Sequence, residues 1–194
     1  MTKNDLAMIE ELARNLDRFA GEGVRKKVME GSEKITASTG KARIASWVKG
    51  AMERLDRLVD EKTRNQVMEN CGYSCADHNK KVIGRMTAKR KKFKSVDEFL
   101  EAEQRKPMRG TKLIREGDVL YYFYTPSTFS KSLRCYCGLL RGLPANEKVS
   151  STYCHCSKGF VEKFWQGVLG RPVNVELVQS AVSGSQECKF AIRL

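Results

Sequence analysis

Hydrophobic residues recur at helical spacing along the first part of the chain. Between residues 4 and 20 they fall three and four positions apart, a period that is typical of an amphipathic helix. The positions on this face are Leu6, Ile9, Leu12, Ala13 and Leu16. Gly21 and Gly23 follow, and glycines at this place indicate the end of the helix.

A second and a third helix follow the same logic. Apolar positions at helical spacing predict one long helix from about Lys41 to Asn70, with Cys71 directly after its end. A short helix is expected from Ser95, because Ser95 and Glu98 have the spacing of a capping box. Pro107 and Gly110 are expected to close it.

The pattern changes to that of strands after residue 110. Residues 112–114 and 119–124, joined by Gly117-Asp118, predict a hairpin, and residues 133–140 predict a further strand that carries Cys135 and Cys137. Ser157 is expected to cap a helix with a broad apolar stripe that ends at Gly170. Residues 173–177 and 188–192 alternate and predict a final hairpin.

Together these elements predict an α+β fold. Residues 1–110 form a mainly helical region, and residues 111–194 form an antiparallel sheet with a crossing helix. No long flexible linker separates them, so one compact unit is expected. A chain of 194 residues can bury a sizeable core without disulfides.

The chain has seven cysteines, and it is too long for them to be explained as the disulfides that stabilise very small proteins. Six of them form close pairs, Cys71/Cys75, Cys135/Cys137 and Cys154/Cys156, and Cys188 stands alone. No window has the apolar length of a signal peptide or a membrane span, so we expect a cytoplasmic protein without a membrane partner. Paired thiols in a reducing compartment are typical of metal ligands, redox centres or buried free cysteines.

Zinc is the metal that such a cluster would hold, because it takes four nitrogen or sulfur ligands. The candidate ligands are Cys71, Cys75, Cys154, Cys156 and Cys188, with His78, Cys135 and Cys137 as weaker candidates. The alternative is that the thiols pack as small hydrophobic side chains.

Cys156 is also the best-placed candidate for a catalytic nucleophile, because a position near a helix N-terminus lowers a thiol pKa. His155 is its candidate base, although it would project to the other side of an extended segment. No phosphate loop, dinucleotide fingerprint or nucleophile elbow is present.

The net charge of +13 raises nucleic acid as a possible partner. The stretch from Lys80 to Lys94 holds eight Lys or Arg and no acidic residue, with Phe93 as its single aromatic. A solvated surface is the favoured interpretation, because a nucleic-acid groove would add interleaved aromatics or a docking motif.

Aromatic residues are concentrated in the second half of the chain. Most are expected in the core, and a few would line a cavity for a small apolar or thiol-reactive molecule. The candidate ligand-binding residues are Tyr136, Tyr153, Trp165 and Phe190.

The stretch from Tyr153 to Leu194 resembles the end of 4-vinyl-reductase-type, hydrocarbon-binding domains. The chain also resembles uncharacterised cysteine-rich prokaryotic proteins with the patterns CGYxCAxHN, CYCGL and YCxCSxG. In metal-bearing sensor domains of that superfamily, three cysteines and a carboxylate bind zinc. The first and last of these cysteines correspond to Cys154 and Cys188, and the middle one falls near Ser180. The missing ligand would then come from Cys156, Glu176 or the Cys71/Cys75 pair.

The sequence therefore predicts a small-molecule-binding or sensor protein with a cysteine-rich site that zinc would occupy. The alternative is a thiol- or metal-dependent hydrolase similar to amino-thiazoline-carboxylate hydrolases, which share a similar cysteine-rich ending. Nucleic-acid binding through Lys80–Lys94 is the third hypothesis, and a homodimer is left open.

Overall fold

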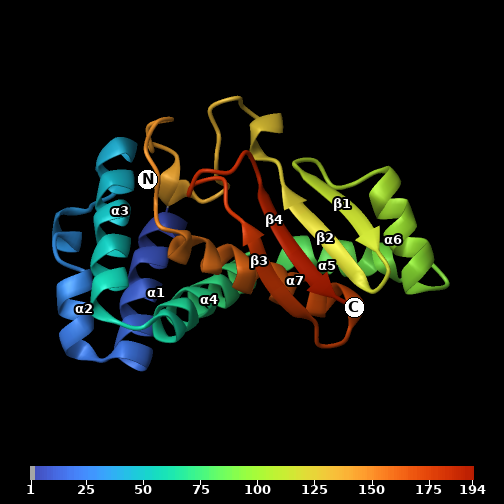
Figure 1. Ribbon diagram of the computed structural model, residues 1–194, viewed down its shortest axis with the longest axis horizontal. Coiled ribbons are helices and arrows are strands. Elements are labelled where there is room, and N and C mark those ends of the chain that lie inside the picture. Colours follow the sequence, from blue (N-terminus) through green and yellow to red (C-terminus); the bar gives the residue numbers. More distant parts are fainter. Residues whose placement is uncertain (1–2) are drawn as a thin grey trace.

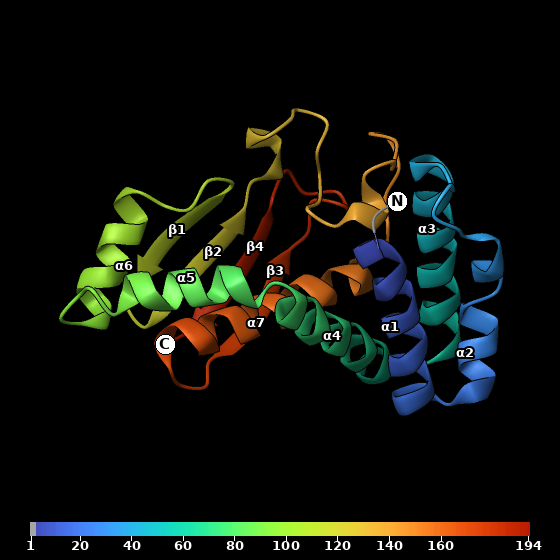
Figure 2. The same cartoon turned by 180° about the vertical axis from the view of Figure 1, so that it is seen from behind.

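The computed structural model describes residues 3–194, and it has the expected α+β architecture. Helices α1, α2 and α3 form one end of the molecule, and the four-stranded sheet lies towards the other (Figure 1). Helix α4 runs between the two ends, and α5 and α7 cover one face of the sheet (Figure 2). The bounds of the seven helices in the described part are α1 Lys3–Ala20, α2 Glu22–Val28, α3 Lys41–Leu58, α4 Glu61–His78, α5 Lys80–Arg90, α6 Val96–Arg105 and α7 His155–Leu169.

The prediction of one long helix from Lys41 to Asn70 is wrong, because this segment forms two helices. Helix α3 ends at Leu58, and Asp60 caps α4 by accepting a hydrogen bond from the Thr63 backbone N–H at 2.9 Å. An aspartate at this position satisfies a free N–H at the start of a helix and favours a new start. Cys71 and Cys75 consequently both lie within α4.

The sheet is antiparallel, with the strand order β1-β2-β4-β3. Its strands are β1 Thr111–Glu116, β2 Val119–Tyr124, β3 Asn174–Gln179 and β4 Cys188–Arg193. Both predicted hairpins are present, and the last strand inserts between β2 and β3. The capping box at Ser95 is also confirmed, since its side chain accepts a hydrogen bond from the Glu98 N–H.

The strand predicted for residues 133–140 is wrong. This segment is a loop that ends in a short 3₁₀ helix, Gly138–Leu140. The Arg134 side chain fixes it by donating hydrogen bonds to the backbone carbonyls of Glu147 at 2.6 Å and Ala181 at 3.0 Å. Five carbonyl contacts from one guanidinium hold the loop against two other segments, so no strand partner is required.

The expected cap of the last helix also differs. A 3₁₀ turn, Ser151–Cys154, runs directly into α7, so the helix begins at His155 and not after Ser157. Ser150 provides the side-chain cap, by accepting a hydrogen bond from the Thr152 N–H at 3.2 Å. Gly170 ends α7 in the left-handed conformation, as expected.

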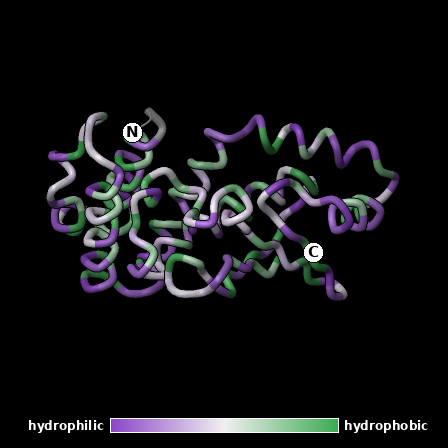
Figure 3. Tube along the Cα trace, turned by 90° about the horizontal axis from the view of Figure 1, so that it is seen from above, coloured by the Kyte–Doolittle hydropathy of each residue, from purple (hydrophilic) through white to green (hydrophobic). Residues whose placement is uncertain are grey.

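Two hydrophobic cores hold these elements together. The first lies between α1, α3 and α4, and it contains Leu16, Met52 and Leu55 without exposed surface. The second lies between the sheet and α7, and it contains Phe164 and Trp165. Hydrophilic positions dominate the outer turns of the trace, and hydrophobic positions lie mainly along its middle (Figure 3). The functional candidates lie where the two cores meet.

Candidate functional site: a sulfur-rich cavity

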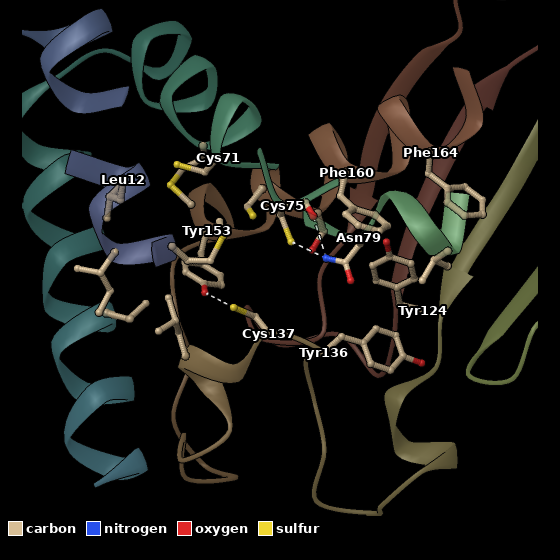
Figure 4. Close-up of a pocket in the computed structure, with 18 of the residues that line it drawn as sticks. Leu12, Cys71, Cys75, Asn79, Tyr124, Tyr136, Cys137, Tyr153, Phe160 and Phe164 are labelled. Carbon is tan, nitrogen blue, oxygen red and sulfur yellow. Dashed lines mark hydrogen bonds between the residues drawn. The ribbon is translucent and has the colours of Figure 1, made fainter. Parts of the chain in front are cut away.

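A cavity of about 360 Å³ lies between the helical end and the sheet end of the molecule. Its wall is almost entirely apolar and comes from α1, α3, α4, α5, α7, two strands and the loops that follow β2 (Figure 4). The lining residues are Met8, Ile9, Leu12, Trp47, Val48, Ala51, Met52, Met68, Cys71, Cys75, Asn79, Val82, Met108, Arg109, Thr111, Tyr122, Tyr124, Phe129, Tyr136, Cys137, Leu139, Tyr153, Cys156, Ser157, Phe160 and Phe164.

Two glycines shape one wall of the cavity, because they let α4 and α7 cross with their backbones in contact. A Cβ atom on Gly72 would lie 2.0 Å from the carbonyl oxygen of Cys156, and one on Gly159 would lie 2.2 Å from that of Glu69. Any larger residue would separate the helices. The crossing brings Cys71 and Cys75 of α4 to the same cavity as Cys156 of α7.

Four thiols and four thioethers line this cavity. The thiols are Cys71, Cys75, Cys137 and Cys156, and the thioethers are Met8, Met52, Met68 and Met108. Cys71 and Cys75 stand one helical turn apart on the same face of α4. Sulfur is polarizable, so this wall suits apolar and aromatic partners.

Neutral hydrogen-bond donors hold three of the thiols in place. The Asn15 side-chain amide donates to Cys71 Sγ at 3.4 Å, and the Asn79 amide donates to Cys75 Sγ at 3.8 Å. The Tyr153 hydroxyl donates to Cys137 Sγ at 3.0 Å. None of these donors is a cation, so none of them provides the positive charge that activates a cysteine.

Burial keeps these thiols protonated. It raises the pKa of Cys71 to about 12 and that of Cys75 to about 11. Desolvation likewise raises the pKa of Cys137 and, most strongly, that of Cys156. Burial thus outweighs the position of Cys156 in the first turn of α7, and a reactive thiolate at Cys156 stays a hypothesis from the sequence.

The described hydrogen-bond partner of the His155 ring is Glu69 and not Cys156. Its ring Nδ1 lies 3.1 Å from Glu69 Oε1, and the same oxygen accepts a hydrogen bond from Lys158 Nζ at 2.6 Å. Burial alone would raise the pKa of Glu69, but these two donors bring it below its ordinary value. His155 and Lys158 therefore form a cluster with α4 that ties the two crossing helices together.

Cys154 and Cys188 form a separate pair outside the cavity lining. Cys154 Sγ lies 2.8 Å from Ser180 Oγ, and Cys188 Sγ accepts a hydrogen bond from the Ala181 N–H at 3.4 Å. A hydrogen bond from the Cys154 thiol lowers the pKa of Cys188, and the same contact, together with burial, raises the pKa of Cys154. Cys156 faces the cavity instead of joining this pair.

The predicted metal ligands thus lie in two places. Within residues 3–194, no group of three or more His, Cys, Asp or Glu side chains is arranged to hold a metal ion. His78 is exposed and lies 2.8 Å from the Ser74 carbonyl oxygen, and Cys135 Sγ accepts a hydrogen bond from the Cys137 N–H. The described residues therefore show no zinc site, and zinc binding stays a prediction from the sequence.

The predicted ligand-binding residues divide in the same way. Tyr136 and Tyr153 line the cavity. Trp165 and Phe190 do not line it, since both are buried in the second core between α7 and the sheet. The sequence did not indicate that the first helices contribute to the wall, through residues such as Leu12 and Trp47. Their apolar faces were visible in the sequence, but a packed core and a cavity wall have the same periodicity.

The basic stretch forms helix α5 and the turn after it. Lys89 pairs with the buried Glu103 of α6, and the exposed Lys80, Lys81, Arg85, Lys91, Lys92 and Lys94 point to solvent. Among residues 3–194, no helix is long and apolar enough to cross a membrane. Nucleic-acid binding and a homodimer stay untested hypotheses, and a cytoplasmic location stays a prediction.

We expect the cavity thiols to resist alkylation. Iodoacetamide at about pH 8 should modify Cys75, Cys137 and Cys156 at least ten times more slowly in the folded protein than in urea, because only the thiolate reacts. A quenched time course followed by peptide mass spectrometry measures each site separately. Fast, selective labelling of Cys156 in the folded protein would contradict this expectation and support the nucleophile hypothesis.

Comparison with known proteins identifies a family but no activity. A comparison with curated proteins finds no match. The resemblance to 4-vinyl-reductase-type domains therefore stays a prediction. Residues 4–194 match the family DUF6144, which is described as a family of unknown function, and the chain therefore belongs to this family.

Proposed function

We propose that this protein binds a small, largely apolar molecule in the sulfur-rich cavity, as a binding or sensor protein. The observation that carries the proposal is the cavity of about 360 Å³ at the junction of the two cores. Natural ligand sites of this kind have about 300 to 1,000 Å³ and a mostly apolar wall with few polar groups. Close packing leaves few voids larger than a water molecule in a protein interior, so a cavity of this size is unusual without a purpose.

The volume suggests the size of the ligand. A cavity of about 150 Å³ accommodates benzene, which has six non-hydrogen atoms. By proportion, 360 Å³ accommodates roughly 15 non-hydrogen atoms. Aromatic walls from Tyr124, Phe160 and Phe164 would contact flat or aliphatic groups of such a molecule.

The chemistry of the wall supports binding over thiol-dependent hydrolysis. A cysteine nucleophile needs a lowered thiol pKa and a base within reach. Burial instead raises the pKa of Cys156, and His155 contacts Glu69. A hydrolase remains the alternative, and the alkylation experiment described above bears on its thiol-dependent form.

A cavity-filling substitution tests the proposal. The neutral fluorescent probe N-phenyl-1-naphthylamine should bind the purified protein with a Kd in roughly the micromolar range. Cys75→Phe places a ring in the cavity and should weaken binding at least about tenfold. Cys75→Ala removes the same thiol without filling the space, so it should bind the probe within a few-fold of the parent protein.

Fluorescence titration measures both variants, and circular dichroism confirms that each is folded. Absence of probe binding to the parent protein would contradict the proposal. Equal binding by folded Cys75→Phe and the parent protein would also contradict it, because the probe would then occupy another surface. Organic extraction of the purified protein followed by mass spectrometry would identify a ligand retained from the cell.

A further inference from the structure

Among the residues that the structure describes, one charged side chain lies at the mouth of the cavity. Three of its lining residues are exposed, namely Asn79, Arg109 and Phe129, and they mark where the cavity meets solvent. Among the described lining residues, Arg109 alone bears a charge. The rest of the wall offers apolar surface, neutral thiols, hydroxyls and one amide.

Arg109 is held at this mouth without an acidic partner. Its guanidinium carbon lies 4.5 Å from the centre of the Phe129 ring, which fixes the group by a cation–π contact. Within residues 3–194, no carboxylate forms an ion pair with Arg109. A planar guanidinium stacked on a ring keeps its N–H donors available at the edge, and these donors match a carboxylate or phosphate.

We propose that the ligand is amphipathic, with an apolar body inside the cavity and one anionic head group at Arg109. This inference rests on the proposed function and names its ligand class. The interior is unsuited to a charge, because an ion buried away from water and without a partner is costly. At the mouth, the same charge keeps contact with water and meets Arg109.

The charge of the whole protein also favours an anionic head group over a cationic one. The net charge of +13 attracts anions towards the protein. Asn79, the second exposed polar residue of the lining, is neutral, and its amide nitrogen donates to the backbone carbonyl and the Sγ of Cys75. A chain of about 12 carbons with its head group agrees with the roughly 15 non-hydrogen atoms that the volume allows.

Three ligands with the same chain test this assignment. Isothermal titration at constant ionic strength and about pH 8 should show that dodecanoate binds at least about tenfold more tightly than dodecanol. Arg109→Ala should remove this difference by weakening dodecanoate about tenfold, while the affinity for dodecanol stays within about twofold. Arg105→Ala, which removes an exposed cation of α6 that is not part of the lining, should change neither affinity.

The outcomes separate the two proposals. Tight binding of dodecyl phosphate or of dodecanoate supports the anionic head, and the stronger of the two identifies its chemistry. Equal affinity of dodecanoate and dodecanol, or no effect of Arg109→Ala on dodecanoate, would overturn this inference and leave the apolar cavity intact as a binding site. If neither these compounds nor N-phenyl-1-naphthylamine bind, the proposed function itself fails.

Discussion

Alkaline pH is expected to destabilise the folded protein by several kcal/mol between about pH 8 and pH 10. Burial raises the pKa of Cys71 to about 12 and that of Cys75 to about 11, from an ordinary value of 9.0. Burial also raises the pKa of Cys135, Cys137 and Cys156, and the hydrogen bond to Cys188 together with burial raises that of Cys154. At pH values well below 9, these thiols are protonated in the folded and in the unfolded chain alike. Above pH 9, the unfolded chain releases these protons first.

The direction of this stability change follows from the linkage between proton binding and folding. A group with a raised pKa in the folded state contributes stability that is complete below the unfolded pKa and is lost as the pH rises towards the folded pKa. Each such thiol costs about 1.4 kcal/mol at pH 10, one unit above the unfolded value. The lowered pKa of Cys188 acts in the opposite direction and offsets a part of the loss.

Urea unfolding under reducing conditions at constant ionic strength, repeated between pH 7.5 and 10, measures this effect. The matched variant is Cys75→Ala, which should lose about 1.4 kcal/mol less than the parent protein over this range. A free energy of unfolding that stays constant up to pH 10 would show that the thiols are not desolvated, and it would contradict the described burial of the cavity wall.

Gly72→Ala and Gly159→Ala are each expected to destabilise the protein by about 3 kcal/mol or more. The new methyl groups would overlap backbone carbonyls of the opposing helix, at 2.0 and 2.2 Å, and backbone cannot move aside as a flexible side chain can. The intrinsic helix preference of alanine over glycine offsets only about 1 kcal/mol. Because α4 and α7 also form the cavity wall, both variants should bind the neutral probe more weakly.

Gly84→Ala is the control for this prediction. Gly84 lies in α5, and a Cβ atom there meets nothing within 4 Å. The same substitution should therefore stabilise the protein by about 0.5 to 1 kcal/mol. Chemical denaturation of the three variants measures all of these changes. Unchanged stability of Gly72→Ala would show that the two helices do not cross in contact at this point.

Sequence patterns identified most of the secondary structure correctly. The capping box at Ser95, the left-handed Gly170 and the alternation in both hairpins are local signals, which depend on neighbours within a few residues. The same signals predicted an α+β fold with a helical first part and an antiparallel sheet at the end. Local signals failed for residues 133–140, because Arg134 fixes this segment through carbonyls that lie far along the chain.

The candidate site depended much more on tertiary structure. The sequence showed that the cysteines form pairs, but not that the Cys154/Cys156 pair would be divided between two environments. In a helical first turn, residues two positions apart point in different directions, so Cys154 meets Ser180 and Cys156 faces the cavity. An extended segment, as the sequence suggested, would have placed both thiols on one side.

The sequence by itself determined the types of element, the apolar faces, the abundance of thiols and the positive charge. Only the tertiary structure decided that α4 and α7 cross at Gly72 and Gly159 and that the two cores leave a cavity between them. It also placed Arg109 at the mouth of that cavity. The physical reason is that periodicity records which side of an element is apolar, whereas a cavity depends on how closely separate elements approach one another.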